Sequence, residues 1–307
     1  MEKNPLISKY VAVGIIFLFV TSSILPATGR VILVTEKTMP IPENFFGLGS
    51  NIEISWDVNQ TKEPIIPRGE LRTVDLGLSF WVTWGKLGRL INYIFRGAPV
   101  RLGVSIIDKP EWCAATLSQG TLFCNIPPPK ENSHQIVHTR MSVQVADVAP
   151  AFELCPVTIQ AIIEPLHGPF GFLTMMQGTI QIVNVTFTVA YYPLVSFSFP
   201  DTNIIETPPL VQVDFRIRMQ NLGNGKTIVE NEVVHYPDGW DVYIPSQVVL
   251  DVYESKEINA TILAPYNFSG EETITLLFTP HSYDNYSLVG SPTLTSILAY
   301  YNPLRCN

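Results

Sequence analysis

The stretch Val211-Gln-Val-Asp-Phe-Arg-Ile-Arg-Met-Gln-Asn-Leu-Gly-Asn-Gly225 decides the fold. Its first nine residues predict a strand, and Gly223-Asn-Gly225 predicts the turn that follows, because glycine and asparagine tolerate the backbone angles of tight turns. Turns at Pro237-Asp-Gly239 and Ser269-Gly270 continue the same rhythm. Short strands at this spacing are typical of a β-sandwich. The further strands that the rhythm predicts cover residues 226–234, 247–252, 256–263 and 272–278.

The preceding part of the chain also reads as strands. Residues 48–56 alternate apolar and polar side chains in the period-2 manner, around Ile52, Ile54 and Trp56. The boundary between the two parts falls where prolines 193, 200, 208 and 209 interrupt regular structure. We therefore predict an all-β protein of two β-sandwich domains, a larger one over residues 30–195 and a second one over residues 196–307. The other strands predicted in the larger domain cover residues 31–35, 71–84, 100–107, 135–145, 157–163 and 179–191.

A family resemblance covers residues 205–280. The quoted stretch, then Pro237-Asp-Gly-Trp240, then residues 248–265 and finally Ser269–Phe278 resemble an Ig-like module of the type that accompanies glycosidases and recurs in bacterial and archaeal cell-surface proteins. The resemblance implies an Ig-like sandwich, and no particular chemistry, since such modules share none. The sequence departs from the family at Tyr253-Glu-Ser-Lys256, where a glycine turn is more usual. The first domain shows no such resemblance.

The N-terminal residues 1–29 predict export. Lys3 and Lys9 precede an apolar run from Tyr10 to Leu25, and Pro26-Ala-Thr-Gly29 resembles a cleavage site with small residues. The run is slightly short for a bilayer span, which favours a signal peptide over a retained membrane anchor. In either case the chain from Arg30 onward is expected outside the cytoplasm, secreted or anchored to the cell membrane.

The charge of the chain limits its partners. The net charge is −8, and residues 196–307 hold 5 basic and 13 acidic side chains. Nucleic acid and anionic lipid both require a basic surface, so neither is an expected partner of the acidic half.

Four cysteines, Cys113, Cys124, Cys155 and Cys306, follow the export segment, and disulfides persist in that compartment. Of the three connectivities that four cysteines allow, we favour Cys113–Cys124 across a hairpin turn at Ser118-Gln-Gly120, with Cys155–Cys306 as the second pair. No metal site is expected, because no CxxC occurs and the nearest histidines lie in another segment.

Five Asn-x-Ser/Thr sequons follow the export segment, more than chance predicts, and they agree with export. They are glycosylation candidates in a host that glycosylates. The five asparagines are Asn59, Asn184, Asn259, Asn267 and Asn285.

Two segments are candidates for contact with a partner. Residues 86–96 carry an apolar stripe at helical spacing, which predicts a crossover helix capping one end of the sandwich, with a membrane-surface or partner-binding helix as the alternative. The segment from Gly168 to Gly178 is rich in apolar residues, which predicts an exposed contact loop or a loop folded over the core. The stripe consists of Leu87, Leu90, Ile91, Ile94 and Phe95, and the loop supplies Phe170, Phe172, Leu173, Met175 and Met176.

The sequence offers no convincing catalytic site. His134 and His138 on a strand would stand about 13 Å apart, too far to share one ion. Glu271 and Glu272 would point to opposite faces of a strand. We therefore expect a non-enzymatic surface protein without a cofactor, which is structural or adhesive through contact with other envelope proteins or with itself.

Two other functions stay open. A carbohydrate-binding module would need exposed aromatic rings, so Trp56, Trp84 and Trp112 would have to be accessible. An accessory ectodomain of a membrane complex would need the N-terminal segment to remain as an anchor.

Overall fold

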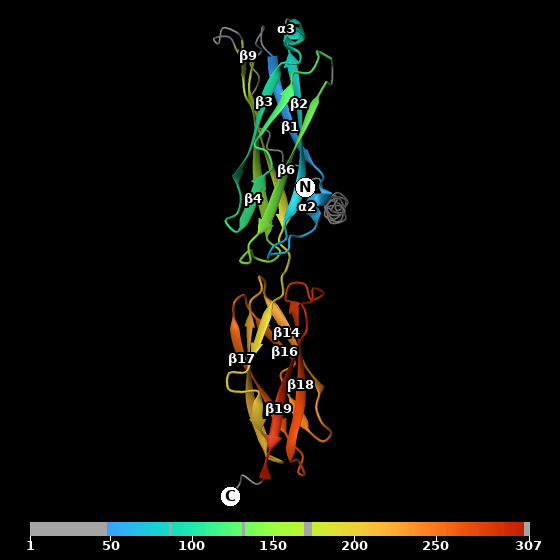
Figure 1. Cartoon of the computed structure of the whole chain (residues 1–307), viewed down its shortest axis with the longest axis vertical. Coiled ribbons are helices and arrows are strands. Elements are labelled where there is room, and N and C mark those ends of the chain that lie inside the picture. Colours follow the sequence, from blue (N-terminus) through green and yellow to red (C-terminus); the bar gives the residue numbers. More distant parts are fainter. Residues whose placement is uncertain (1–47, 86–87, 131–132, 169–173, 304–307) are drawn as a thin grey trace, which may run out of the picture. The chain divides into compact units, whose positions relative to one another are not determined.

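The computed structural model describes residues 48–85, 88–130, 133–168 and 174–303. In this part of the chain almost all regular structure is strand, and the buried apolar residues form two separate clusters, one over residues 48–189 and one over residues 205–299. The predicted all-β fold with two sandwiches is therefore confirmed (Figure 1). No helix within the described ranges is long and apolar enough to cross a membrane.

The first sandwich packs a six-stranded sheet against a four-stranded sheet. The six-stranded sheet has the order β4-β6-β2-β1-β9-β8, and the four-stranded sheet has the order β10-β7-β3-β5. The strand bounds in the first sheet are β1 Leu48–Trp56, β2 Arg72–Trp84, β4 Cys113–Leu117, β6 Gln135–Val145, β8 Leu166–His167 and β9 Thr174–Met176; those in the second are β3 Pro99–Asp108, β5 Thr121–Asn125, β7 Leu154–Ile163 and β10 Thr179–Thr188.

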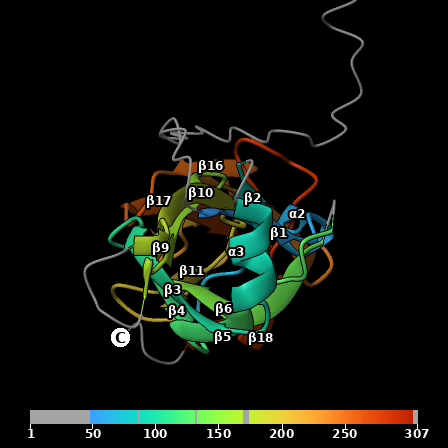
Figure 2. The same ribbon diagram turned by 90° about the horizontal axis from the view of Figure 1, so that it is seen from above.

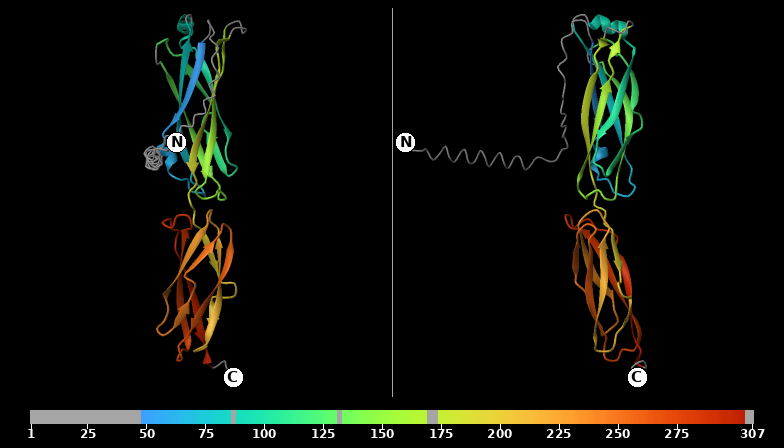
Figure 3. Two further views of the ribbon diagram at one scale, coloured as in Figure 1. Left: turned by 180° about the vertical axis from the view of Figure 1, so that it is seen from behind. Right: turned by 90° about the vertical axis from the view of Figure 1, so that its left-hand side faces the viewer.

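Alternation along the strands builds the first core. In β2 the side chains of Val74, Leu76, Leu78, Phe80 and Val82 are all buried, at every second position. Figure 3 shows the two sheets of the sandwich face to face. These side chains belong to one buried apolar core together with side chains of the opposite sheet. Burial of this apolar surface is the main force that holds the sheets together.

Side chains close one edge of this sandwich, where β1 and β10 lie next to each other in different sheets. Thr179 Oγ1 donates to the carbonyl oxygen of Ser50, and the Ile54 N–H donates to Gln181 Oε1 at 2.9 Å. These side chains satisfy backbone groups that would otherwise face an open sheet edge. The remaining elements of this domain are two short helices, α2 (Asn59–Lys62) and α3 (Gly88–Phe95).

The second sandwich has the Ig-like arrangement that the resemblance implied. A four-stranded sheet, β11-β13-β17-β15, packs on a five-stranded sheet, β12-β19-β18-β14-β16. In the first of these orders no two neighbouring strands are consecutive in the chain, as in immunoglobulin-type sandwiches. The bounds are β11 Val195–Ser198, β12 Ile204–Glu206, β13 Gln212–Asn221, β14 Thr227–His235, β15 Asp241–Tyr243, β16 Gln247–Leu250, β17 Ser255–Leu263, β18 Gly270–Ser282 and β19 Thr293–Tyr301.

The turn after β13 is fixed by two buried asparagines. Asn221 Nδ2 donates to the carbonyl oxygens of Gly225 and Asp251, at 2.9 and 3.2 Å, and its Oδ1 accepts from the Gly223 N–H. Asn224 Nδ2 donates to the carbonyls of Ala149 and Ala190. A Cβ at Gly223 would clash with the carbonyl oxygen of Tyr192, so only glycine fits there.

The departure from the family pattern at Tyr253 has a clear structural result. Tyr253 adopts φ 62°, in the left-handed region, and stands in the turn that links β16 to β17. β16 pairs with β14 and β17 pairs with β13 and β15, so this turn crosses between the two sheets and is not a hairpin turn. A tyrosine here adopts the left-handed conformation that glycine adopts more easily. The Glu254 carboxylate holds the turn by accepting from the Asp251 N–H at 2.7 Å.

Candidate interaction surfaces

Helix α3 connects β2 of one sheet to β3 of the other, so it crosses one end of the first sandwich (Figure 2). Its inner face consists of Gly88, Ile91, Asn92 and Phe95, at the spacing i, i+3, i+4 and i+7. The predicted crossover helix is present, but the predicted stripe is not its buried face. Of the described stripe residues only Ile91 and Phe95 pack on the core, because Gly88 and Asn92 occupy the rest of the inner side.

The outer face of α3 is apolar and exposed. The exposed fractions are 62% for Leu90, 57% for Tyr93 and 66% for Ile94. These residues stand at i, i+3 and i+4, so their side chains are neighbours on the helix surface. The Arg96 guanidinium lies over the Tyr93 ring, 5.0 Å from its centre. We call Leu90, Tyr93 and Ile94 the outer triad.

Asn92 is an unusual core residue beneath the outer triad. It is completely buried, and neither its amide nitrogen nor its amide oxygen has a hydrogen-bond partner among the residues described. A buried amide without hydrogen-bond partners lowers the free energy of unfolding. The inner side of α3 is therefore not optimised for the stability of the sandwich.

The predicted contact loop is only partly described. Met176 is fully buried and belongs to the first core, so its prediction as a surface contact is wrong; Met175 is half-buried. Met176 is drawn inward because β9 adds to the sheet beside β1, where it faces Leu48. Since Leu48 also faces Trp84 at the end of β2, β9 and α3 lie at the same end of the sandwich. The other candidates, Leu87, Phe170, Phe172 and Leu173, lie outside the described residues.

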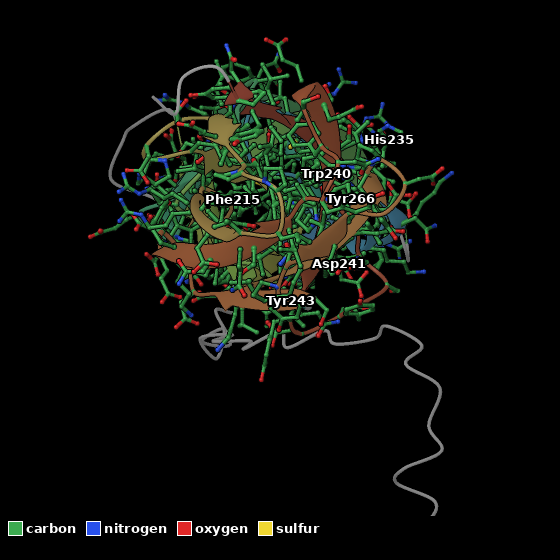
Figure 4. All side chains as sticks on the ribbon, turned by 90° about the horizontal axis from the view of Figure 1, so that it is seen from below. Phe215, His235, Trp240, Asp241, Tyr243 and Tyr266 are labelled. Carbon is green, nitrogen blue, oxygen red and sulfur yellow. The ribbon has the colours of Figure 1, made fainter. Side chains whose placement is uncertain are left out.

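A second surface, not found from the sequence, lies at one end of the second sandwich (Figure 4). Tyr243 and Tyr266 are 68% and 77% exposed, and Tyr236 is exposed as well. Trp240 lies at the same end and is buried against Phe268 in an edge-to-face contact, with 4.6 Å between the ring centres. We call Tyr236, Tyr243 and Tyr266 the tyrosine end. Tyr243 ends β15 and Tyr266 follows β17, so the pairing of these two strands places both tyrosines at this end of the sandwich. Tyr236 follows the end of β14.

The chain continues from Tyr266 into β18, which begins at Gly270. An open hollow of about 410 Å³ lies at the start of that strand. It is lined by Gly270, Glu271, Tyr300, Tyr301, Asn302 and Pro303. With its aromatic lining and neighbouring tyrosines, this end has the chemistry of a surface that stacks against flat or apolar groups.

The tryptophans offer no common platform. Trp56, Trp84 and Trp112 are half-buried and pack against the first core. Trp81 alternates to the outer side of β2, where its ring lies 4.9 Å from the ring of His134. The rings that the carbohydrate alternative required therefore serve mainly as core.

The predicted Cys113–Cys124 hairpin is wrong. β4 and β5 do not pair with each other: β4 pairs with β6 in one sheet, and β5 pairs with β3 in the other. The turn at residues 118–120 passes from sheet to sheet instead of joining neighbouring strands. Cys113, Cys124 and Cys155 are all buried, and Cys306 lies outside the described residues.

All five sequon asparagines are exposed: Asn59, Asn184, Asn259, Asn267 and Asn285. Asn184 and Asn259 stand on the outer faces of β10 and β17, and the others stand in turns or at the start of α2. Their side chains are therefore accessible to a modifying enzyme.

The carboxylates and histidines that the sequence raised do not converge. Glu271 and Glu272 are exposed, as are Asp238 and Asp241 beside the turn after β14, and no group of three or more metal-ligating side chains occurs among the described residues. One titratable cluster was not foreseen. Glu230 accepts a hydrogen bond from the Tyr286 hydroxyl and lies 3.2 Å from His281 Nε2, with the His281 and Tyr286 rings stacked. The Tyr286 hydrogen bond holds the pKa of Glu230 below its usual range.

Comparison with known proteins gives no assignment. No family model and no curated protein matches the chain. Among solved structures it is similar to the CupB6 tip adhesin from Pseudomonas aeruginosa, at 7% identity over 82% of this chain and 98% of that one, with a TM-score of 0.29. It is also similar to the E. coli chaperone DraB, at 8% identity over 80% and 98% of the two chains (TM-score 0.27). The PapD-like domain 7 of human CEP192 matches 35% of this chain and 84% of its own, at 10% identity (TM-score 0.28). Likenesses this weak carry no argument about function.

Proposed function

We propose that the chain is a non-enzymatic, extracytoplasmic surface protein that binds a protein partner through the outer triad on α3. The observation that carries this proposal is the outward orientation of the apolar side chains Leu90, Tyr93 and Ile94. Apolar side chains gathered on one exposed helix face, with a tyrosine among them, are typical of protein contact sites. Arg89 and Arg96 flank the triad and are exposed, which gives it a polar rim.

A protein partner fits the helix better than a membrane surface does. Interfacial helices carry a strongly basic polar face that attracts anionic headgroups. Helix α3 spans only eight residues, and its sole basic side chain is Arg89. The inner face is already used for packing, so the helix offers a small apolar patch and not a long amphipathic surface.

The test uses two exposed isoleucines on the same sandwich. Ile94 and Ile136 are 66% and 61% exposed, and Ile136 lies on the outer face of β6, away from the triad. We expect Ile94→Lys to lose a protein that co-purifies with the wild-type chain from detergent extracts of the producing cells, and Ile136→Lys to retain it. Both variants should unfold within about 1 kcal/mol of the wild type, because neither position is buried. Retention by Ile94→Lys would contradict the proposal.

The same experiment reports on the kind of partner. Co-purification of a differently tagged copy of this chain would make the contact a self-association, and another envelope protein would make it a heterologous one. If the N-terminal segment stays attached, as an intact mass beginning near Met1 would indicate, the chain is an anchored ectodomain rather than a secreted protein.

A second candidate function is carbohydrate binding at the tyrosine end. It is favoured by the exposure of Tyr243 and Tyr266 beside a hollow of about 410 Å³. On a glycan array, Tyr266→Ala should lose any signal that the wild type gives, and Tyr253→Ala, at another exposed tyrosine, should keep it. A glycan on the adjacent Asn267 would cover this surface, so occupancy there would count against this second candidate.

A further inference from the structure

We propose that Cys113 and Cys155 form a disulfide that links the two sheets of the first sandwich. Cys113 is the first residue of β4 in the six-stranded sheet, and Cys155 lies near the start of β7 in the four-stranded sheet. Both side chains are buried, at 1% and 0% exposure. The two residues lie at the same end of the sandwich, because the end of β3 pairs with the start of β7 (Asp108 with Thr158) and the short loop 109–112 leads from β3 to Cys113. A hydrogen bond between the two thiols is also the largest cause of the pKa shift of each. The inference is independent of the proposal for α3.

Strand direction excludes Cys124 from this pair. β4 runs parallel to β2 because both are antiparallel to β6, so Cys113 lies at the end where β2 begins. β5 is antiparallel to β3 and ends beside its start, where Cys124 faces Val100. Since α3 joins the end of β2 to the start of β3, Cys113 and Cys124 lie at opposite ends of the sandwich. Cys124 Sγ instead lies 4.0 Å from the Val100 carbonyl oxygen.

The surroundings of the pair favour the reaction. Lys109 Nζ donates to the Cys113 carbonyl oxygen at 2.5 Å, which places a positive charge beside the two sulfurs. The hydrogen bond from Cys155, with a smaller contribution from the Lys109 charge, lowers the pKa of Cys113, whereas the same bond raises that of Cys155. Cys113 is therefore the thiol that ionises and attacks first.

The chemistry requires a disulfide oxidant, such as glutathione disulfide or the active-site disulfide of an export-compartment oxidase. The Cys113 thiolate attacks one sulfur of the oxidant, breaks its S–S bond and forms a mixed disulfide, while the released thiolate takes up a proton. Cys155, after losing its proton, attacks the Cys113 sulfur and expels the second thiolate of the oxidant. Two electrons and two protons leave the protein, and the oxidant becomes two thiols. Because both sulfurs are buried in the folded chain, the oxidant reaches them through a local opening of this end of the sandwich that leaves Lys109 beside Cys113.

The expected physical effect is a higher melting temperature. A disulfide between residues 113 and 155 closes a loop and so restricts the unfolded chain. Loss of such a disulfide lowers the melting temperature of a domain by roughly 5–15 °C. Reduction should therefore lower the melting temperature of the wild-type chain, provided that the reductant acts on the unfolded state.

The test counts thiols in the full chain made in an oxidising compartment. The protein is alkylated in denaturant without reductant, and the mass gives the number of free thiols. Cys113→Ala and Cys155→Ala should each show one more free thiol than the wild type, because each releases the partner sulfur. Cys124→Ala, the matched control at another buried cysteine, should show one free thiol fewer than the wild type. Non-reducing digestion should give a peptide pair that joins Cys113 to Cys155.

Two results would overturn the inference. One is a linked peptide that joins Cys113 or Cys155 to Cys124 or Cys306. The other is full alkylation of the wild type, with no change in its melting temperature on reduction. The double variant Cys113→Ala/Cys155→Ala guards against a folding defect, because its melting temperature should match that of the reduced wild type and be insensitive to reductant.

Discussion

Asn221 shows how one buried polar side chain organises the second sandwich. Its amide uses both donor and acceptor capacity on backbone groups of the turn after β13 and of the segment after β16. The residue is completely buried, so water cannot replace these bonds. The turn at residues 223–225 is thus held by asparagine as much as by glycine.

Asn221→Ala should therefore destabilise the protein strongly. The substitution leaves several backbone groups without partners in a dry site, and we expect a loss of about 2–4 kcal/mol in the free energy of unfolding. Urea denaturation measures it. Asn125→Ala, on the exposed side of β5, should stay within about 0.5 kcal/mol of the wild type. Equal effects of the two substitutions would show that the Asn221 bonds do not stabilise the fold.

The Glu230 cluster predicts a pH dependence. The pKa of Glu230 is lowered in the folded state, chiefly by the Tyr286 hydrogen bond, from an ordinary value of 4.5. A lowered carboxyl pKa stabilises the fold above that ordinary value, and this stabilisation disappears as the pH falls through the folded pKa. Tyr286→Phe should raise the Glu230 pKa toward its ordinary value and weaken the loss of stability in acid.

Carbon-13 NMR titration of the Glu230 carboxyl group measures this shift directly. Tyr283→Phe is the control, because the Tyr283 ring contacts Lys226 and makes no bond to Glu230 that lowers its pKa. An unchanged Glu230 pKa in Tyr286→Phe would show that the hydrogen bond is not its cause.

For the helices and strands, the sequence predicted where each element lies better than it predicted which face of the element is buried. The strand predictions for residues 48–56 and 135–145 match β1 and β6, because alternation there is set by one buried sheet face. The stripe of α3 failed because periodicity identifies an apolar face without showing that it is the inner one. Here a glycine and an asparagine fill the space against the core. The tyrosine end depends on the pairing of β15 with β17, which are not consecutive strands, and the nearness of Cys113 to Cys155 depends on the packing of one sheet on the other. Local sequence patterns carry no information on either arrangement.

Tyr253 offers a test of the turn between β16 and β17. A tyrosine with φ 62° is strained, because its Cβ crowds the backbone in the left-handed region. Glycine relieves the strain but is less favourable through the entropy of the unfolded chain, so we expect Tyr253→Gly to raise stability by up to about 1 kcal/mol. Tyr253→Val should lower stability by about 1 kcal/mol, since β-branched residues tolerate this region poorly. Thermal denaturation of both variants measures the difference, and a stabilising valine would contradict the assignment.

For the whole molecule, we propose that the chain is exported and modified at its exposed sequon asparagines. The five sequon asparagines are exposed, whereas the buried asparagines Asn92, Asn221, Asn224 and Asn231 all stand outside sequons. Modification at the five sites would place glycans only on accessible surface, where they cost the fold nothing.

We therefore predict glycans when the chain is secreted from a cell that glycosylates asparagine. Peptide mass spectrometry should find glycans at sequon sites, and each Asn→Gln change should remove one site without lowering the melting temperature. Efficient secretion of the chain with all five sites bare would contradict this prediction.

The most direct test of the proposed function compares the two exposed aromatic surfaces. The photo-reactive residue p-benzoylphenylalanine replaces Tyr93 in one variant and Tyr266 in another, and both are irradiated in the producing cells. The account predicts a discrete protein adduct from position 93 and none from position 266, because α3 carries the protein contact. No adduct from position 93, or an adduct from position 266 alone, would contradict it.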